Sequence, residues 1–197
     1  DFNNLLTGIL GNADILLYEL PQNIEIQQRI IEIKRATKLA SELTNQMLAY
    51  SGKGTFIIEQ IDINDLIIDM NSLLEASISK KVALSYSLLP ELPGFKGDAT
   101  QIRQIVMNLV LNGSEAIENT GTISVTTSQA ELKHPDIDSL TINHNLAPGN
   151  YILLEIRDSG CGIENDKIKQ IFDPFFTTKF TGRGLGLAAV SGIIRSH

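Results

Sequence analysis

Apolar residues at the start of the chain recur at spacings that alternate between four and three positions. They are Phe2, Leu6, Ile9, Ala13, Leu16 and Leu20, and this spacing is typical of a helix packed in a bundle. Pro21 interrupts the pattern, and a second helical pattern follows from Ile26 to Met47. Two helices with a short connection predict an antiparallel hairpin. Because a lone hairpin would expose much apolar surface, we expect it to dimerise into a four-helix bundle.

Beyond Gly54 the pattern changes to a mixture of strands and helices. Asn64 is expected to cap one helix and Asp98 another, where Gln101 would complete a capping box. A long polar hairpin loop is expected between the last two strands. The expected strands are 55–63, 82–89, 121–132 and 150–158, and the expected helices follow Asn64 and span 97–118 and 183–197. This mixture predicts an α/β or α+β sandwich.

Composition narrows the function classes. The 197 residues suit one large domain or two small ones, and the net charge of −7 argues against broad binding of nucleic acid or of an anionic membrane surface. A single cysteine, Cys161, excludes an internal disulfide and fits a reducing compartment. The apolar runs are too short for a spanning helix. We therefore expect a segment without direct membrane contact.

One predicted helix carries amides that could bind a metal. Asn108 and Asn112 are one helical turn apart, and Glu115 follows on the next turn. Mg²⁺ accepts asparagine oxygens beside phosphate and water, although a plain polar helix edge would show the same residues. Gly113 inside this helix costs roughly 1 kcal/mol relative to alanine, which indicates that a neighbour needs the space.

Three further segments could hold a ligand. Asp158 ends a predicted strand and enters a turn with Gly160 and Gly162, where a carboxylate could accept a hydrogen bond from a purine amine. The segment FDPFFTTKF reads as a mobile lid that brings Lys179 over phosphates, or as a loop pinned by its aromatic rings. The run GRGLGLAAV opens a helix, where glycine-rich backbone suits phosphate oxygens.

In this order the asparagine helix, the Asp-x-Gly-x-Gly turn, the phenylalanine-rich segment and the Gly-x-Gly-x-Gly run resemble the N, G1, F and G2 boxes of sensor histidine kinases. These kinases share an ATPase superfamily with gyrase, Hsp90 and MutL. The opening DFNNLL resembles the H box written His-Asp-Phe-Asn-Asn. The resemblance covers nearly the whole chain and implies an α+β protein. Residues 1–52 would form a dimerisation and phosphotransfer hairpin, and residues 53–197 a catalytic ATP-binding sandwich.

The resemblance implies that ATP phosphorylates a histidine expected just before Asp1, and that the phosphoryl group then passes to an aspartate of a response-regulator receiver domain. Asp1 would orient the histidine, and Asn4 would orient a water that dephosphorylates the receiver. Asp158 would select adenine, and Asn112 would bind Mg²⁺. A cytoplasmic homodimer, cut from a longer protein, is expected. The implied nucleotide-binding residues are Asn108, Asn112, Glu115, Asp158, Gly160, Gly162, Phe172, Lys179, Gly182, Gly184, Leu185 and Gly186.

Two other functions fit part of the pattern. ATPases of the gyrase, Hsp90 or MutL type carry a glutamate where this chain has Asn108, and the helical hairpin in front also favours the kinase. A nucleotide-binding dimeric scaffold, or a receiver phosphatase without kinase activity, is the second alternative. It gains weight because His134, His144 and His197 lie in a loop and at the chain end, away from the H box.

Overall fold

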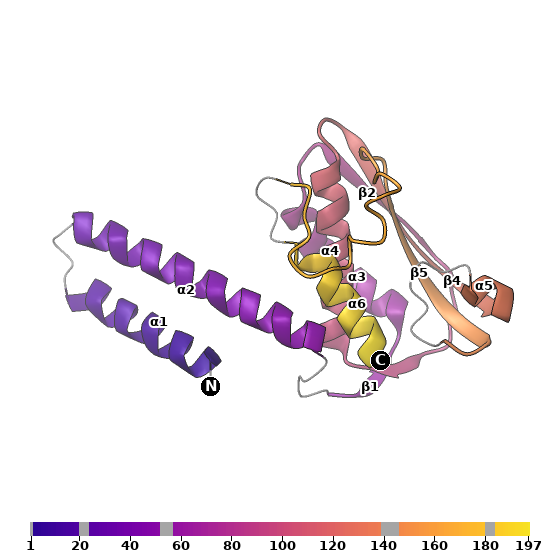
Figure 1. The fold of residues 1–197 in the computed structure, drawn as a ribbon, viewed down its shortest axis with the longest axis horizontal. Helices are drawn as coiled ribbons and strands as arrows, with labels where there is room; N and C mark the ends of the chain where they lie inside the picture. Colours follow the sequence, from indigo (N-terminus) through magenta and orange to yellow (C-terminus); the bar gives the residue numbers. More distant parts are fainter. Residues whose placement is uncertain (1, 20–23, 52–56, 139–145, 180–183) are drawn as a thin grey trace.

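The computed structural model describes residues 2–19, 24–51, 57–138, 146–179 and 184–197. Figure 1 shows a helical hairpin beside a layered α+β unit. The elements are, in order, α1 (Phe2–Glu19), α2 (Ile24–Ser51), β1 (Glu59–Ile61), α3 (Ile63–Ser77), β2 (Val82–Leu88), β3 (Phe95–Gly97), α4 (Ala99–Ala116), β4 (Gly121–Leu132), α5 (His134–Asp138), β5 (Gly149–Asp158) and α6 (Gly186–Ser196). None of the helices in these ranges has the length and apolarity needed to cross a membrane.

The expected hairpin is formed by α1 and α2, which run side by side (Figure 1). Leu6 and Ala13 of α1 and Ile30 of α2 are buried between the helices. An exposed ion pair between Lys34 and Asp14 joins them at the surface. The apolar stripe of α1 therefore has an inner part inside the hairpin and an outer part that stays exposed.

The second unit is a sheet covered by helices. β2 pairs in parallel with β4, and β4 pairs antiparallel with β5, while β1 and β3 form a separate antiparallel pair. The helices α3, α4 and α6 lie on the same side of the three-stranded sheet (Figure 1). Their apolar faces meet the buried side of β4 in one core, whose fully buried members include Ile67, Val106, Ile123 and Ile193. The expected α+β architecture is confirmed.

The start of α3 differs from the prediction. The cap is Asp62, whose Oδ1 accepts hydrogen bonds from the N–H groups of Asn64 at 2.8 Å and Asp65 at 3.2 Å. Asn64 lies inside the first turn, and its amide instead accepts from the buried Thr127 hydroxyl at 2.7 Å. Because Ile63 is buried in the core, the helix begins there. The expected strand 55–63 is accordingly reduced to Glu59–Ile61 within the described residues.

One of the two predicted interactions of the α4 capping box is present. The Asp98 carboxylate accepts from the N–H groups of Thr100 and Gln101, at 2.9 and 3.1 Å. The return bond of the capping box is not made by Gln101, because the Asp98 N–H donates to Nε2 of His197 at 3.0 Å. The last residue of the chain thus completes the cap, which a local sequence pattern could not indicate.

The stretch between β4 and β5 contains a short helix in its described part. The two strands pair antiparallel as expected of a hairpin, but the short helix α5 begins directly after β4, at His134. His144, also expected in this loop, lies outside the described residues.

Candidate functional site

The polar face of α4 meets the start of α6. The Asn108 Nδ2 donates a hydrogen bond to the carbonyl of Gly186 at 3.3 Å. A Cβ atom added at Gly186 would lie 3.5 Å from Nδ2 of Asn112. The two asparagines, predicted to share a face, therefore both lie against the first residue of α6.

The first turn of α6 is suited to an anion. The helix opens with Gly-Leu-Ala-Ala and has no acidic side chain in that turn. Leu185 precedes it, and its buried aliphatic side chain cannot cap the N–H groups of the first turn. Backbone N–H groups and the helix dipole favour negative charge at such a terminus. The site thus offers backbone donors beside the amides of Asn108 and Asn112.

Gly184 joins this terminus to the phenylalanine-rich segment. Its φ is +64°, and an added Cβ would lie only 2.4 Å from backbone atoms of Phe175 and Phe176. The Phe175 N–H donates to the Gly184 carbonyl at 2.8 Å, and Phe175 itself has a φ of 69°. Only glycine fits at position 184, because both the backbone conformation and the close approach exclude a side chain.

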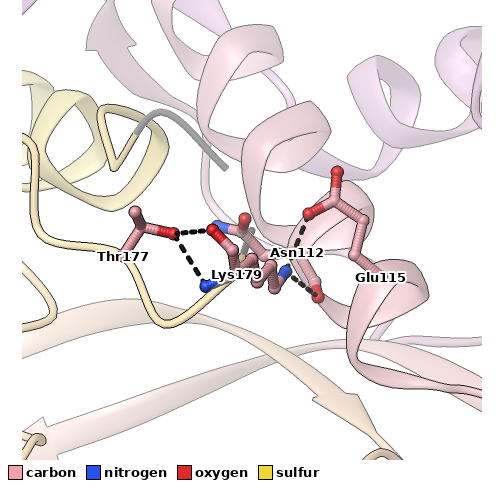
Figure 2. Close-up of polar contacts among 4 residues, drawn as sticks. All are labelled: Asn112, Glu115, Thr177 and Lys179. Carbon is pink, nitrogen blue, oxygen red and sulfur yellow. Dashed lines mark hydrogen bonds and ion pairs between the residues drawn. The ribbon is translucent and has the colours of Figure 1, made fainter. Parts of the chain in front are cut away.

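Lys179 extends from this segment to α4, as Figure 2 shows. Its Nζ lies 2.7 Å from Oε2 of Glu115 and donates to the backbone carbonyl of Asn112 at 3.4 Å. The Lys179 N–H donates to the Thr177 hydroxyl at 3.1 Å, which fixes the turn before the lysine. Thr177 was missed by the sequence reasoning, although it stands in the same TTK segment as Lys179.

Asp158 and its turn pack against the last turns of α4, at Gly113 and Ala116. An added Cβ at Gly113 would lie 3.1 Å from the Cβ of Asp158, and one at Gly160 would lie 2.6 Å from the carbonyl of Ala116. The Asp158 Oδ1 accepts from the Gly160 N–H at 2.8 Å, and the Cys161 N–H donates to the Ala116 carbonyl at 3.1 Å. The neighbour that needs the space at Gly113 is therefore the carboxylate-bearing end of β5.

Not every predicted residue is brought into this cluster. Gly162 has a φ of +72° and open space around it. Phe172 is half-buried in the segment before Phe175, and Asn4 is exposed on the first turn of α1. Asp1 and Gly182 lie outside the described residues. Their predicted roles stay predictions.

Residues 97–197, which hold this whole cluster, match the family of histidine kinase-, DNA gyrase B- and HSP90-like ATPases. The chain belongs to this family. A helical hairpin precedes the matched residues, as expected for the histidine kinases of this family. The relatives are also sensor kinases. The fold and the relatives are those of a histidine kinase catalytic core.

The sensor kinase CckA of Brucella abortus (strain 2308) is 34% identical over 198 residues, which cover 99% of this chain and 20% of CckA. Full-length ShkA, crystallised in complex with AMPPNP, matches with a TM-score of 0.74 at 24% identity, over 99% of this chain and 39% of ShkA. The histidine kinase ThkA, crystallised in complex with the response regulator protein TrrA, matches 90% of this chain and 48% of ThkA, at 22% identity and a TM-score of 0.53. The two structural likenesses show the fold. The chain spans about a fifth of the length of CckA.

Proposed function

We propose that the chain is the catalytic core of a cytoplasmic sensor histidine kinase, in which residues 53–197 bind ATP and residues 1–52 form the dimerisation and phosphotransfer hairpin. One observation carries the proposal. The asparagines of α4, the first turn of α6, Lys179 and the Asp158 turn meet around one helix, in a domain of an ATPase family. The relative crystallised with AMPPNP supports ATP as the nucleotide.

Two groups of residues around the second half of α4 are proposed to divide the nucleotide between them. Asp158 is proposed to accept a hydrogen bond from the exocyclic amine of adenine, since a carboxylate keeps acceptor positions beyond the one used by Gly160. Gly160 and Gly162 leave two positions of the turn without side chains. The N–H groups near Gly184 and Gly186, with Lys179, are proposed to hold the phosphates.

Asn112 is proposed to hold Mg²⁺ together with the phosphates. The donor set fits this ion, because Mg²⁺ keeps several waters and takes one or two protein oxygens beside phosphate. In the part of the chain that the structure describes, no cluster of three His, Cys, Asp or Glu side chains could hold a metal by itself. The ion would neutralise charge on the transferred phosphoryl group. Glu115, predicted near this site, is instead paired with Lys179.

The proposed reaction is phosphoryl transfer to a histidine just before Asp1. An imidazole nitrogen would attack the γ-phosphorus in line as the bond to the bridging oxygen breaks, and ADP would leave. Asp1 is proposed to accept the hydrogen bond of the other imidazole nitrogen, and Asn4 to orient water toward the phosphorylated aspartate of a receiver domain. The complex of ThkA with a response regulator supports this class of partner.

One alternative has a structural feature against it, and the other is decided by the phosphorylation experiment. An ATPase that hydrolyses nucleotide with a glutamate on this helix is disfavoured, because Asn108 takes that position and its amide binds Gly186. A scaffold or phosphatase without kinase activity differs from the proposal only in the phosphorylation step.

The test is incubation with γ-labelled ATP of the chain as it stands and of a variant with a histidine restored before Asp1. We expect label on the second protein alone, and binding of ATP by both.

Asp158→Asn should weaken ATP binding by about 1.5–3 kcal/mol, the value of a hydrogen bond to a charged group, without loss of fold. Glu155→Gln removes the same charge from the exposed side of β5 and serves as the control. Binding without labelling of the restored variant would favour the scaffold, and unchanged affinity in Asp158→Asn would refute the adenine assignment.

A further inference from the structure

Lys179, the lysine proposed for the phosphates, is already engaged by α4. Its ammonium group has three N–H donors. One contact is made with Glu115 at 2.7 Å and another with the carbonyl of Asn112 at 3.4 Å, and Figure 2 shows the side chain turned toward the helix. Most of its hydrogen-bonding capacity is thus directed to oxygens of the protein.

The pair also cancels the charge that would attract a nucleotide. Lys179 is the positive side chain that the structure places on this turn, and the Glu115 carboxylate neutralises it at contact distance. A neutral pair attracts phosphates much less than a free ammonium does.

The pair is exposed enough to open. The Glu115 side chain is 58% exposed and that of Lys179 is 35% exposed. Ion pairs with this access to water are worth little, because water and salt screen them. Phosphate groups carry more charge than one carboxylate, so they can take the lysine, and the released Glu115 can be hydrated where it stands.

We propose that Glu115 competes with nucleotide phosphates for Lys179 and thereby limits the affinity for nucleotide. This inference rests on the proposed function. When nucleotide leaves, Glu115 recaptures the lysine, which favours release of the product. Glu115 is therefore an affinity-setting residue that acts through Lys179, and it opposes phosphate binding where its place beside Asn112 had suggested a nucleotide ligand.

The test measures the affinities of Glu115→Gln for ATP, ADP and adenosine by calorimetry, with Mg²⁺ and at fixed ionic strength. We expect ATP and ADP to bind about two- to fivefold more tightly, the range of an exposed ion pair, and adenosine to bind unchanged. In a Lys179→Met background the same substitution should have no effect. Glu118→Gln is the matched control, since Glu118 is an exposed acid just beyond the end of α4, and its affinities should equal those of the wild type.

A fall in ATP affinity in Glu115→Gln would overturn the inference and make Glu115 a support of Lys179. An unchanged affinity, or an equal gain in Glu118→Gln or in the Lys179→Met background, would also overturn it. Thermal unfolding by circular dichroism verifies that each variant is folded. If the wild type binds ATP and Asp158→Asn weakens that binding, the proposed nucleotide site stands whatever Glu115→Gln does. A wild type that binds no nucleotide would overturn both.

Discussion

At the scale of single residues, the site depends on where side chains are missing. The sequence indicated that Gly113 is costly in a helix and that a neighbour needs its space. The structure identifies that neighbour as Asp158, whose Cβ would lie 3.1 Å from an added Cβ. The sequence shows that Gly113 is unfavourable in a helix but not which residue packs against it, because the contact joins two elements that meet only in the fold. α4 runs unbroken through Gly113, so the glycine serves packing and does not interrupt the helix.

Gly160 allows a sharper test of the same packing. In Gly160→Ala the new Cβ would lie 2.6 Å from the Ala116 carbonyl and 2.7 Å from Oδ1 of Asp158. The turn must then move away from α4, and we expect nucleotide affinity to fall roughly tenfold or more, as for loss of a hydrogen bond to a charged group. Fluorescence titration with a nucleotide analogue measures the affinity.

Gly162→Ala is the comparison for that experiment, because Gly162 has a positive φ but open space around it. It should lower the free energy of unfolding by about 1–2 kcal/mol through backbone strain and affect the affinity less than Gly160→Ala. A Gly160→Ala protein that binds nucleotide as tightly as the wild type would show that the turn need not pack on Ala116.

At the scale of elements, the sequence predicted strong local patterns well and tertiary choices poorly. The bounds of β4 were predicted to the residue, and buried positions alternate with less buried ones through Ile123, Val125 and Thr127. The cap of α3 was misplaced because Asp62 and Asn64 are both good caps, and only the burial of Ile63 decides between them. The pairing of Glu115 with Lys179 was not predictable, because nothing in either motif indicates the other.

The start of α4 gives a prediction about pH. Asp98 is buried, which by itself raises the pKa of its carboxyl group, but hydrogen bonds from the N–H groups of Ile57, Gln101 and Thr100 outweigh burial and lower the pKa below its ordinary value of 3.8. A lowered pKa in the folded state means that the carboxylate stabilises the fold above that ordinary value. This contribution is lost as the pH falls through the lowered value.

We therefore expect the free energy of unfolding to decrease as the pH falls from about 5 to about 3, and Asp98→Asn to flatten this decrease by about 1 kcal/mol. Asparagine is chosen because it caps a helix as aspartate does but does not titrate. Urea unfolding at several pH values provides the measurement, and Asp69→Asn, an exposed position on α3, is the control. Equal slopes in Asp98→Asn and the wild type would refute the assignment.

At the scale of the whole molecule, the order of elements followed from the sequence but their pairing did not. The parallel register of β2 with β4, and the separate pair of β1 with β3, join strands that are not neighbours in the chain. Periodicity says which face of an element is apolar, and it does not say which partner covers that face. The same limit applies to the hairpin, where the apolar stripe of α1 predicted a bundle but not which of its residues face α2. The structure divides it, because Leu6 and Ala13 are buried within a single hairpin while Ile9 and Leu16 remain exposed.

This division determines how dimerisation is tested. A charge at Leu6, which is 7% exposed, would disrupt the hairpin itself and say little about a dimer. Ile9 and Leu16 are 45% and 43% exposed, so a double substitution Ile9→Glu and Leu16→Glu should leave the hairpin folded and remove apolar area from the outer face. Burial of apolar surface is worth about 25 cal/mol per Å², and charges in its place should raise the dissociation constant of the dimer by a factor of ten or more.

Light scattering over a range of concentrations gives the mass, and circular dichroism gives the helix content. Tyr18→Glu, at a position that is 88% exposed, should stay dimeric. A double variant that remains dimeric, or a wild type that is monomeric at high concentration, would place the outer face of α1 outside any dimer interface.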